Sequence, residues 1–150
     1  MSYHSGRKTK IHIKEGFVRI LLGFMLPRRE HFSREKSRVA VNKRNYALEK
    51  EQLRNAFEEG MEGKEPIIFK NPVIVCYRYH YPEGYHACDN DAIDTKYCSD
   101  LITSYFLFDD GPHKVSYYID AVFENTDIPY TEVMIIEKNS STLVEEIMNS

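Results

Sequence analysis

Three aspartates stand close together in the stretch HACDNDAIDTK, residues 86–96. They are Asp89, Asp91 and Asp94, and Lys96 follows two positions after the last of them. Carboxylates that converge on one point repel each other and cannot all stay ionised unless a cation lies between them. Oxygen ligands without a paired His or Cys suit a hard ion such as Mg²⁺ or Mn²⁺. Such an ion typically works on phosphate.

A second acidic pair is Asp109–Asp110, and a helical pattern of about 17 residues separates it from the first acids. A straight helix of that length holds its ends some 25 Å apart, at about 1.5 Å per residue. The two clusters therefore meet within one chain only if the strand after Asp110 returns beside the strand that ends at Tyr81. If they meet, the candidate metal ligands are Asp89, Asp91, Asp109 and Asp110, and the candidate catalytic residues are Asp89, Asp91, Asp110 and Lys96.

Acidic residues, histidines and cysteines have other common roles in proteins. An isolated acid is more often a helix cap or a turn residue than a ligand. An EF-hand is excluded because Asp94 and Asp100 occupy the loop positions that require Gly and Glu. A zinc site is a weaker alternative, because the spacing of its possible ligands matches no zinc finger. Those ligands are His80, His86, Cys88 and Cys98.

Apolar periodicity predicts the elements that must position these residues. We expect a hairpin around Glu15-Gly16, a helix over 44–61, and a second helix from Asp91 to the turn FDDGP. Asp91 and Asp94 then fall in the first turn of that second helix, where negative charge suits the helix dipole. Alternation predicts a strand over 73–81, and 114–123 and 131–137 are interpreted as two more strands, while Thr142 with Glu145 predicts a short C-terminal helix. This order predicts one α+β domain with a mixed or mainly antiparallel sheet over 11–150, after a flexible basic stretch over 1–10.

Charge is distributed unevenly along the chain. Its net charge of −3 combines 14 Lys/Arg and 5 Asp/Glu in residues 1–56 with 6 and 18 in the remainder. Such a division suggests a basic surface near an acidic site, although a solvated tail and helix face would give the same count. The basic residues that could hold DNA phosphates are Arg28, Arg29, Arg34, Lys36, Arg38, Lys43 and Arg44.

Three cysteines without a CxxC pair indicate a reduced, cytoplasmic protein. The longest apolar run, residues 17–26, contains Arg19 and is too short to span a bilayer. No small-residue cleavage site follows it, so we do not interpret it as a signal peptide.

The segment from Pro72 to Glu137 resembles the RusA-type Holliday junction resolvases of phages and prophages. The resemblance lies in Asp89-Asn90-Asp91, in a helix carrying Lys96 and Asp100, and in Asp109-Asp110 before a strand. It covers about two thirds of the chain. The sequence departs from the family at Ala92, where the motif has Asn, and in the position of Lys96, which lies one residue late.

The resemblance implies a RusA-like fold and a Mg²⁺-dependent endonuclease, a homodimer that resolves four-way DNA junctions in recombination and repair. It assigns Asp89, Asp91 and Asp110 as ligands, with Lys96 assisting. A two-fold dimer could present one site to each of two paired strands. The alternative is a catalytically degenerate phage DNA-binding or adaptor protein on the same scaffold, which Ala92 motivates.

Overall fold

The computed structural model describes residues 8–29, 36–108, 111, 114–139, 145–147 and 149, with the backbone alone over 36–46. A five-stranded sheet forms the centre, in the order β1-β2-β5-β3-β4. All neighbours are antiparallel except β3 and β4, which run parallel. The elements are β1 (Lys10–Lys14), β2 (Phe17–Leu22), α1 (Lys36–Met61), β3 (Val73–Pro82), η1 (Asn90–Ala92), α2 (Lys96–Phe106), β4 (Val115–Glu124) and β5 (Tyr130–Glu137).

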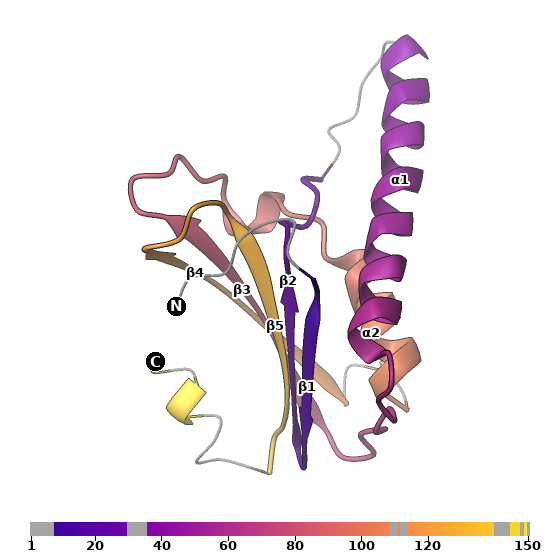
Figure 1. The fold of residues 1–150 in the computed structure, drawn as a ribbon, viewed down its shortest axis with the longest axis vertical. Coiled ribbons are helices and arrows are strands. Elements are labelled where there is room, and N and C mark those ends of the chain that lie inside the picture. The colour runs from indigo at the N-terminus through magenta and orange to yellow at the C-terminus, as the bar shows by residue number, and fades with distance from the viewer. Residues whose placement is uncertain are drawn as a thin grey trace.

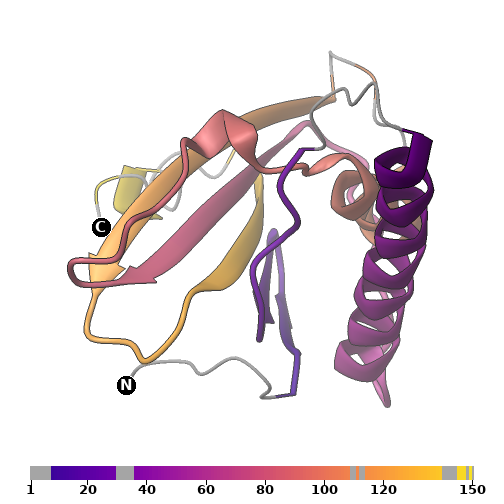
Figure 2. The same cartoon turned by 90° about the horizontal axis from the view of Figure 1, so that it is seen from above.

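Both long helices cover the same face of the sheet, as Figures 1 and 2 show. Alternate residues of the strands point toward the helices and form one continuous core with them. Tyr77, Tyr79 and Tyr81 of β3 contribute three of the largest fully buried side chains. The opposite face carries a smaller apolar cluster of Cys76, Met134 and Ile136. The sheet is therefore apolar on its helix side and mixed on the other, which we call the open face.

The predicted α+β class with one mixed sheet is confirmed. The hairpin at Glu15-Gly16 and the three long strands also lie within a residue of their predicted positions. Residues 8–10 of the stretch that we expected to be flexible belong to the fold, since Thr9 is buried and Lys10 pairs with Leu21. Thr142, half of the predicted capping box, lies outside the described residues.

Both predicted helices have different limits in the structure. The first begins at Lys36, eight residues before its predicted start. The second begins at Lys96, so the prediction that Asp91 and Asp94 occupy its first turn is wrong. Asp91 lies instead in the separate 3-10 turn η1. The buried side chains of α2 are Cys98, Ile102 and Phe106, and Tyr97, Leu101 and Tyr105 are partly buried beside them.

No helix among the described residues is long and apolar enough to cross a membrane.

The last turn of α1 packs closely on the hairpin. A Cβ atom at Gly60 would lie 2.7 Å from Ile11 Cγ1 and 2.8 Å from Ile11 Cδ1. Only glycine therefore lets the helix approach β1 this closely.

We expect Gly60→Ala to destabilise the protein by about 1–2 kcal/mol. The clash with fully buried Ile11 costs about 1–3 kcal/mol, and better helix propensity returns at most about 1 kcal/mol. Urea unfolding measures the difference. Asn55→Ala, at an exposed position of the same helix, is the control and should not destabilise. A Gly60→Ala protein as stable as wild type would contradict the close packing.

Candidate functional site

The acidic stretch forms an exposed turn between β3 and α2. Asp89 is extended and immediately precedes η1, and Asp91 lies within it. The Ala92 N–H donates a 3.0 Å hydrogen bond to the Asp89 carbonyl oxygen, which closes the turn. Both carboxylate residues are exposed. Two oxygen ligands therefore stand two residues apart on one short turn and are open to solvent.

The acidic turn is tied to the first basic pair of the chain. Arg28 and Ile93 form an antiparallel β-bridge. The Arg29 N–H donates to the Ala92 carbonyl oxygen at 2.7 Å, and the Asp94 N–H donates to the Pro27 carbonyl oxygen at 2.8 Å. Both arginine side chains are exposed. The backbones of two arginines are thus hydrogen-bonded to the segment that carries the candidate ligands, although about sixty residues separate them in sequence.

Asp94 has a local structural role. Its Oδ1 accepts a 3.0 Å hydrogen bond from the Lys96 N–H at the start of α2. The bond satisfies one of the donors that a helix N-terminus leaves without an intrahelical partner. The Lys96 side chain is exposed at this same helix end. Asp94 thus behaves as a capping carboxylate, while Lys96 adds a third cation near the turn.

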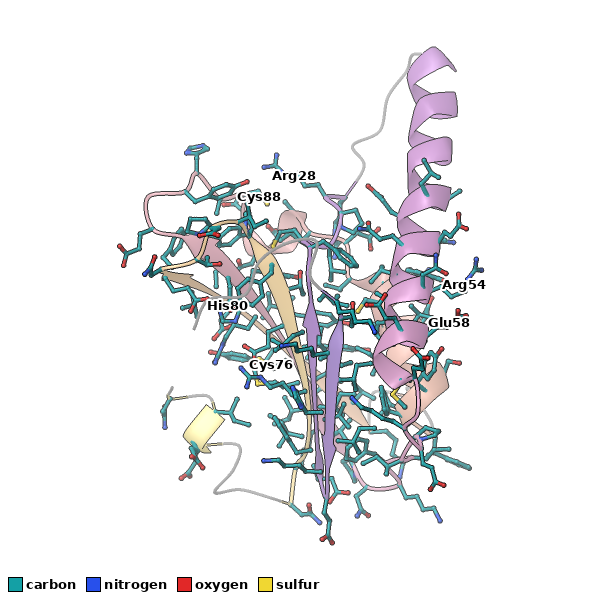
Figure 3. All side chains as sticks on the ribbon, viewed as in Figure 1. Arg28, Arg54, Glu58, Cys76, His80 and Cys88 are labelled. Atoms are coloured by element: carbon teal, nitrogen blue, oxygen red, sulfur yellow. The ribbon has the colours of Figure 1, made fainter. Side chains whose placement is uncertain are left out.

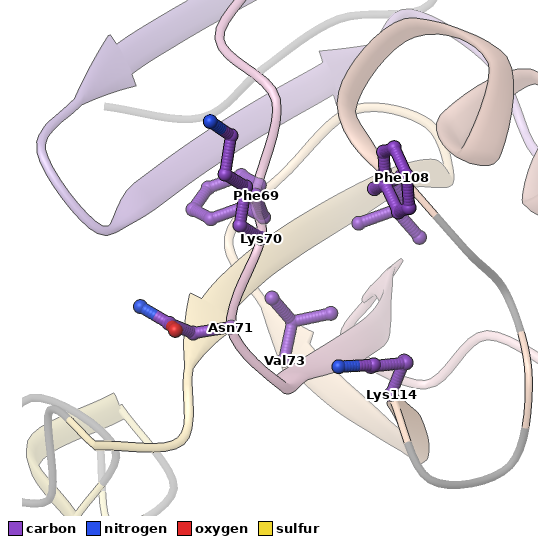
Figure 4. A pocket seen from close by; sticks show the side chains of 7 residues that line it. Phe69, Lys70, Asn71, Val73, Phe108 and Lys114 are labelled. Carbon is purple, nitrogen blue, oxygen red and sulfur yellow. The ribbon is translucent and has the colours of Figure 1, made fainter.

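Asp109 and Asp110 lie outside the described residues, but their neighbours are placed. The carbonyl oxygen of Gly111 accepts hydrogen bonds from the N–H groups of Lys114 and Val115, and Val115 pairs with Val73 at the start of β3. Phe108 and Lys114 border a small hollow there with Phe69 and Val73 (Figure 4).

The crossover that we required of the strand after Asp110 is present, because β4 runs beside β3. This return is parallel, so Gly111 lies near the first residue of β3, whereas Asp89 follows its last. The helix between the two acidic clusters has 11 residues and is about 16 Å long, instead of the 25 Å predicted for 17 residues.

The other candidate DNA contacts are placed in part. Arg34 lies outside the described residues, and Lys36, Arg38, Lys43 and Arg44 have only their backbone described, in the N-terminal half of α1. In Figure 1 that end of α1 rises beyond the end of the sheet at which β2 and β3 finish. Figure 3 shows Arg28 near the same end, together with Cys88, whereas Arg54 and Glu58 lie farther along α1.

Within the part of the chain that the structure describes, no three His, Cys, Asp or Glu side chains gather closely enough to hold a metal ion by themselves. His80, His86, Cys88 and Cys98 therefore form no zinc site. Cys76, Cys88 and Cys98 are free thiols, as expected. Burial raises the pKa of the Cys98 thiol to about 12, so this cysteine is a neutral core residue at physiological pH.

A polar network on the open face was not predicted from the sequence. Glu132 on β5 is 3% exposed and accepts hydrogen bonds from Arg19 of β2 and from His80 Nε2 of β3, the latter at 2.8 Å. His80 Nδ1 lies 3.0 Å from Glu124 Oε1 on β4, and the Tyr130 hydroxyl donates to the same oxygen at 2.7 Å. Four strands thus share one charged cluster. A sequence feature that indicated this cluster was Glu132, an acidic residue within the mostly apolar segment TEVMII.

Electrostatics keep Glu132 ionised despite its burial. Burial alone would raise its pKa, but the hydrogen bond from His80 and the charge of Arg19 outweigh that cost, so the pKa lies below its usual value. Beside this network, Arg78 is held by Asp120 at 3.0 Å and donates a 3.0 Å hydrogen bond to the Ile147 carbonyl oxygen. Each carboxylate of the network has a cationic or hydrogen-bonding partner, which is the arrangement of a structural cluster.

The comparison with protein families gives a match along nearly the whole sequence, over residues 2–144. The chain belongs to the DUF6100 family, a family of unknown function. No curated protein and no solved structure matches the chain. Membership of DUF6100 therefore assigns no activity to the chain.

Proposed function

We propose that the protein is a metal-dependent endonuclease that resolves branched DNA, with four-way junctions as its substrate. The observation that carries this proposal is the backbone pairing of Arg28 and Arg29 with the acidic turn. A nuclease needs carboxylates for a cation and basic groups for the phosphate backbone at the same place. A helix cap or a solvated turn needs only the carboxylates.

The donor set suits a hard cation. Mg²⁺ demands oxygen ligands, keeps several waters, and is commonly held by one or two carboxylates together with substrate phosphates. Asp89 and Asp91 supply two such carboxylates. Asp110, with Asp109 beside it, stays a prediction as the third ligand, because the neighbouring Gly111 lies near the start of β3 whereas Asp89 follows its end. When bound, such an ion lowers the pKa of a coordinated water and polarises the scissile phosphate.

The chain's own residues supply the remaining parts of the reaction. Arg28 and Arg29 bind phosphate oxygens and orient the strand, because guanidinium groups match phosphate geometry. Lys96 is proposed to stabilise the negative charge that develops on the phosphate. Basic residues along the first half of α1 extend the grip on DNA. A homodimer would offer one such site to each of two paired strands.

Metal binding tests the ligand assignment without DNA. Titration with Mn²⁺, followed by electron paramagnetic resonance, should show binding by wild type and at least tenfold weaker binding by Asp89→Asn or Asp91→Asn, because each change removes a charged ligand. Glu62→Gln, which removes an exposed carboxylate at the end of α1, is the control. Equal binding by all four proteins would remove Asp89 and Asp91 from the site.

Salt dependence tests the arginines separately. Arg28→Ala and Arg29→Ala should each weaken binding to a four-way junction and reduce the slope of log K against log salt by about 0.9, the value for one lost phosphate contact. Arg54→Ala, an exposed arginine on α1, should leave the slope unchanged. An unchanged slope in the first two variants would show that these arginines do not contact phosphate.

A further inference from the structure

Three aromatic rings form a stack where β3 and β4 end. Tyr81 of β3 is 2% exposed and lies between Tyr85 and Phe123. Its ring centroid is 5.5 Å from the ring centroid of each neighbour. The rings are inclined by only 16° and 29°. Tyr85 is 46% exposed and Phe123 is 51% exposed. The centre of the stack is thus fixed in the core, while both of its outer rings remain half open to solvent.

This stack lies beside the proposed phosphate contacts. Burial raises the pKa of the Tyr81 hydroxyl to about 12, and the nearby charge of Arg28 opposes that rise. Arg28 is bridged to Ile93, directly after η1. In turn η1 packs against β4, the strand that carries Phe123. Exposed ring faces, an exposed arginine and the acidic turn therefore share one end of the sheet.

We propose that the Tyr85–Tyr81–Phe123 stack receives an unpaired DNA base, and this inference rests on the nuclease function proposed above. A base stacked on an exposed aromatic ring contributes about 1–3 kcal/mol, and every base offers such a face. In fully paired DNA the faces are covered by neighbouring base pairs. Among branched substrates, four-way junctions included, the preferred one would therefore carry an unpaired base at the branch point near the scissile phosphate, which Arg28 would hold.

A second copy of the chain is the competing occupant of this region. β4 is an edge strand of ten residues, and exposed edges invite pairing with another strand. Pairing through the edge would also cover Tyr118, which is 39% exposed and alternates onto the open face. Base stacking involves Phe123 and Tyr85 but not Tyr118. The arginine beside the stack favours a phosphate-bearing ligand.

The experiment uses a synthetic flapped DNA whose unpaired position carries 2-aminopurine, with Ca²⁺ replacing Mg²⁺, and a blunt duplex as the reference. We expect wild type to quench the 2-aminopurine fluorescence. Phe123→Ala and Tyr85→Ala should bind the flapped DNA about 10–100-fold more weakly and abolish the quenching. Tyr85→Phe, which retains a ring, should behave as wild type. Tyr118→Ala is the matched control and should bind within twofold.

Two results would overturn the inference. One is equal affinity and equal fluorescence for wild type, Phe123→Ala and Tyr85→Ala. The other is a loss of binding in Tyr118→Ala accompanied by dissociation of an oligomer in sedimentation velocity, which would assign β4 to a second copy. Four-way-junction cleavage, measured in parallel, separates the two proposals. Cleavage without stacking leaves the nuclease intact, and stacking without cleavage leaves a DNA-binding protein.

Discussion

Asp91→Asn should abolish DNA cleavage while leaving the fold intact. A bound cation contributes several kcal/mol of transition-state stabilisation, and each 1.36 kcal/mol changes the rate tenfold. Loss of one ligand should therefore lower the single-turnover rate at least about a thousandfold. Asp91 is exposed within η1 and packs in no core, so its replacement by a neutral isostere leaves the structure undisturbed.

Stability provides the matching control for Asp91→Asn. In the absence of metal, the change removes one negative charge from a turn that also carries Asp89, so the free energy of unfolding should stay equal or rise. Junction cleavage and urea unfolding measured on the same preparations test both statements. Glu62→Gln should cleave as wild type does. An Asp91→Asn protein that retains activity but loses stability would make Asp91 a structural residue.

Glu132→Gln should be the most destabilising single change outside the apolar core. Loss of the Glu132 charge leaves buried His80 without its carboxylate partner and costs about 1–3 kcal/mol, because the Arg19 side chain is 46% exposed and can be solvated. Glutamine keeps the shape of the side chain but not the charge that holds Arg19 and His80. Urea unfolding measures the loss. Glu137→Gln, at the partly exposed end of the same strand, should change stability by less than about 0.5 kcal/mol.

Lowering the pH should remove the stabilisation that ionised Glu132 provides. The pKa of Glu132 is lower in the folded protein than its ordinary value of 4.5, so its contribution is complete above that pH. It is lost as pH falls from about 4.5 through the folded pKa, where the carboxyl becomes protonated. Wild type should therefore lose more stability than Glu132→Gln between pH 6 and pH 3. Identical pH dependence in the two proteins would contradict the ion network.

The strands were predictable because each satisfies a local rule. VIVCYRYHY places alternate residues on the two faces of one sheet, and TEVMIIE is a mostly apolar, β-branched run typical of a central strand. The helix limits were not predictable in this way. Residues 36–43 extend past the sheet in Figure 1 and need no apolar stripe, so periodicity missed them. Ile93 is extended, and the backbone hydrogen bonds of its neighbours Ala92 and Asp94 join it to residues 27–29, which no local pattern reveals.

The same distinction between local patterns and contacts across the chain applies to the candidate site. Asp89 and Asp91 could be proposed as ligands from their types and spacing alone, since neighbouring carboxylates repel each other unless a cation lies between them. The partnership with Arg28 and Arg29 depends on a bridge across more than sixty residues, so the sequence offered those arginines only as members of a basic segment. Glu132 and His80 were missed as a pair because their contact arises from the antiparallel register of β3 and β5.

Cleavage of a synthetic four-way junction distinguishes a metal-dependent nuclease from a non-catalytic DNA-binding protein. Purified wild-type protein is incubated with a labelled synthetic four-way junction, and with a linear duplex of the same sequence, in Mg²⁺, Mn²⁺ or EDTA. We predict paired nicks in the junction with either metal, intact duplex, and no cleavage in EDTA. A preparation that binds the junction but never nicks it in Mg²⁺ or Mn²⁺ would contradict the nuclease and leave a non-catalytic DNA-binding protein.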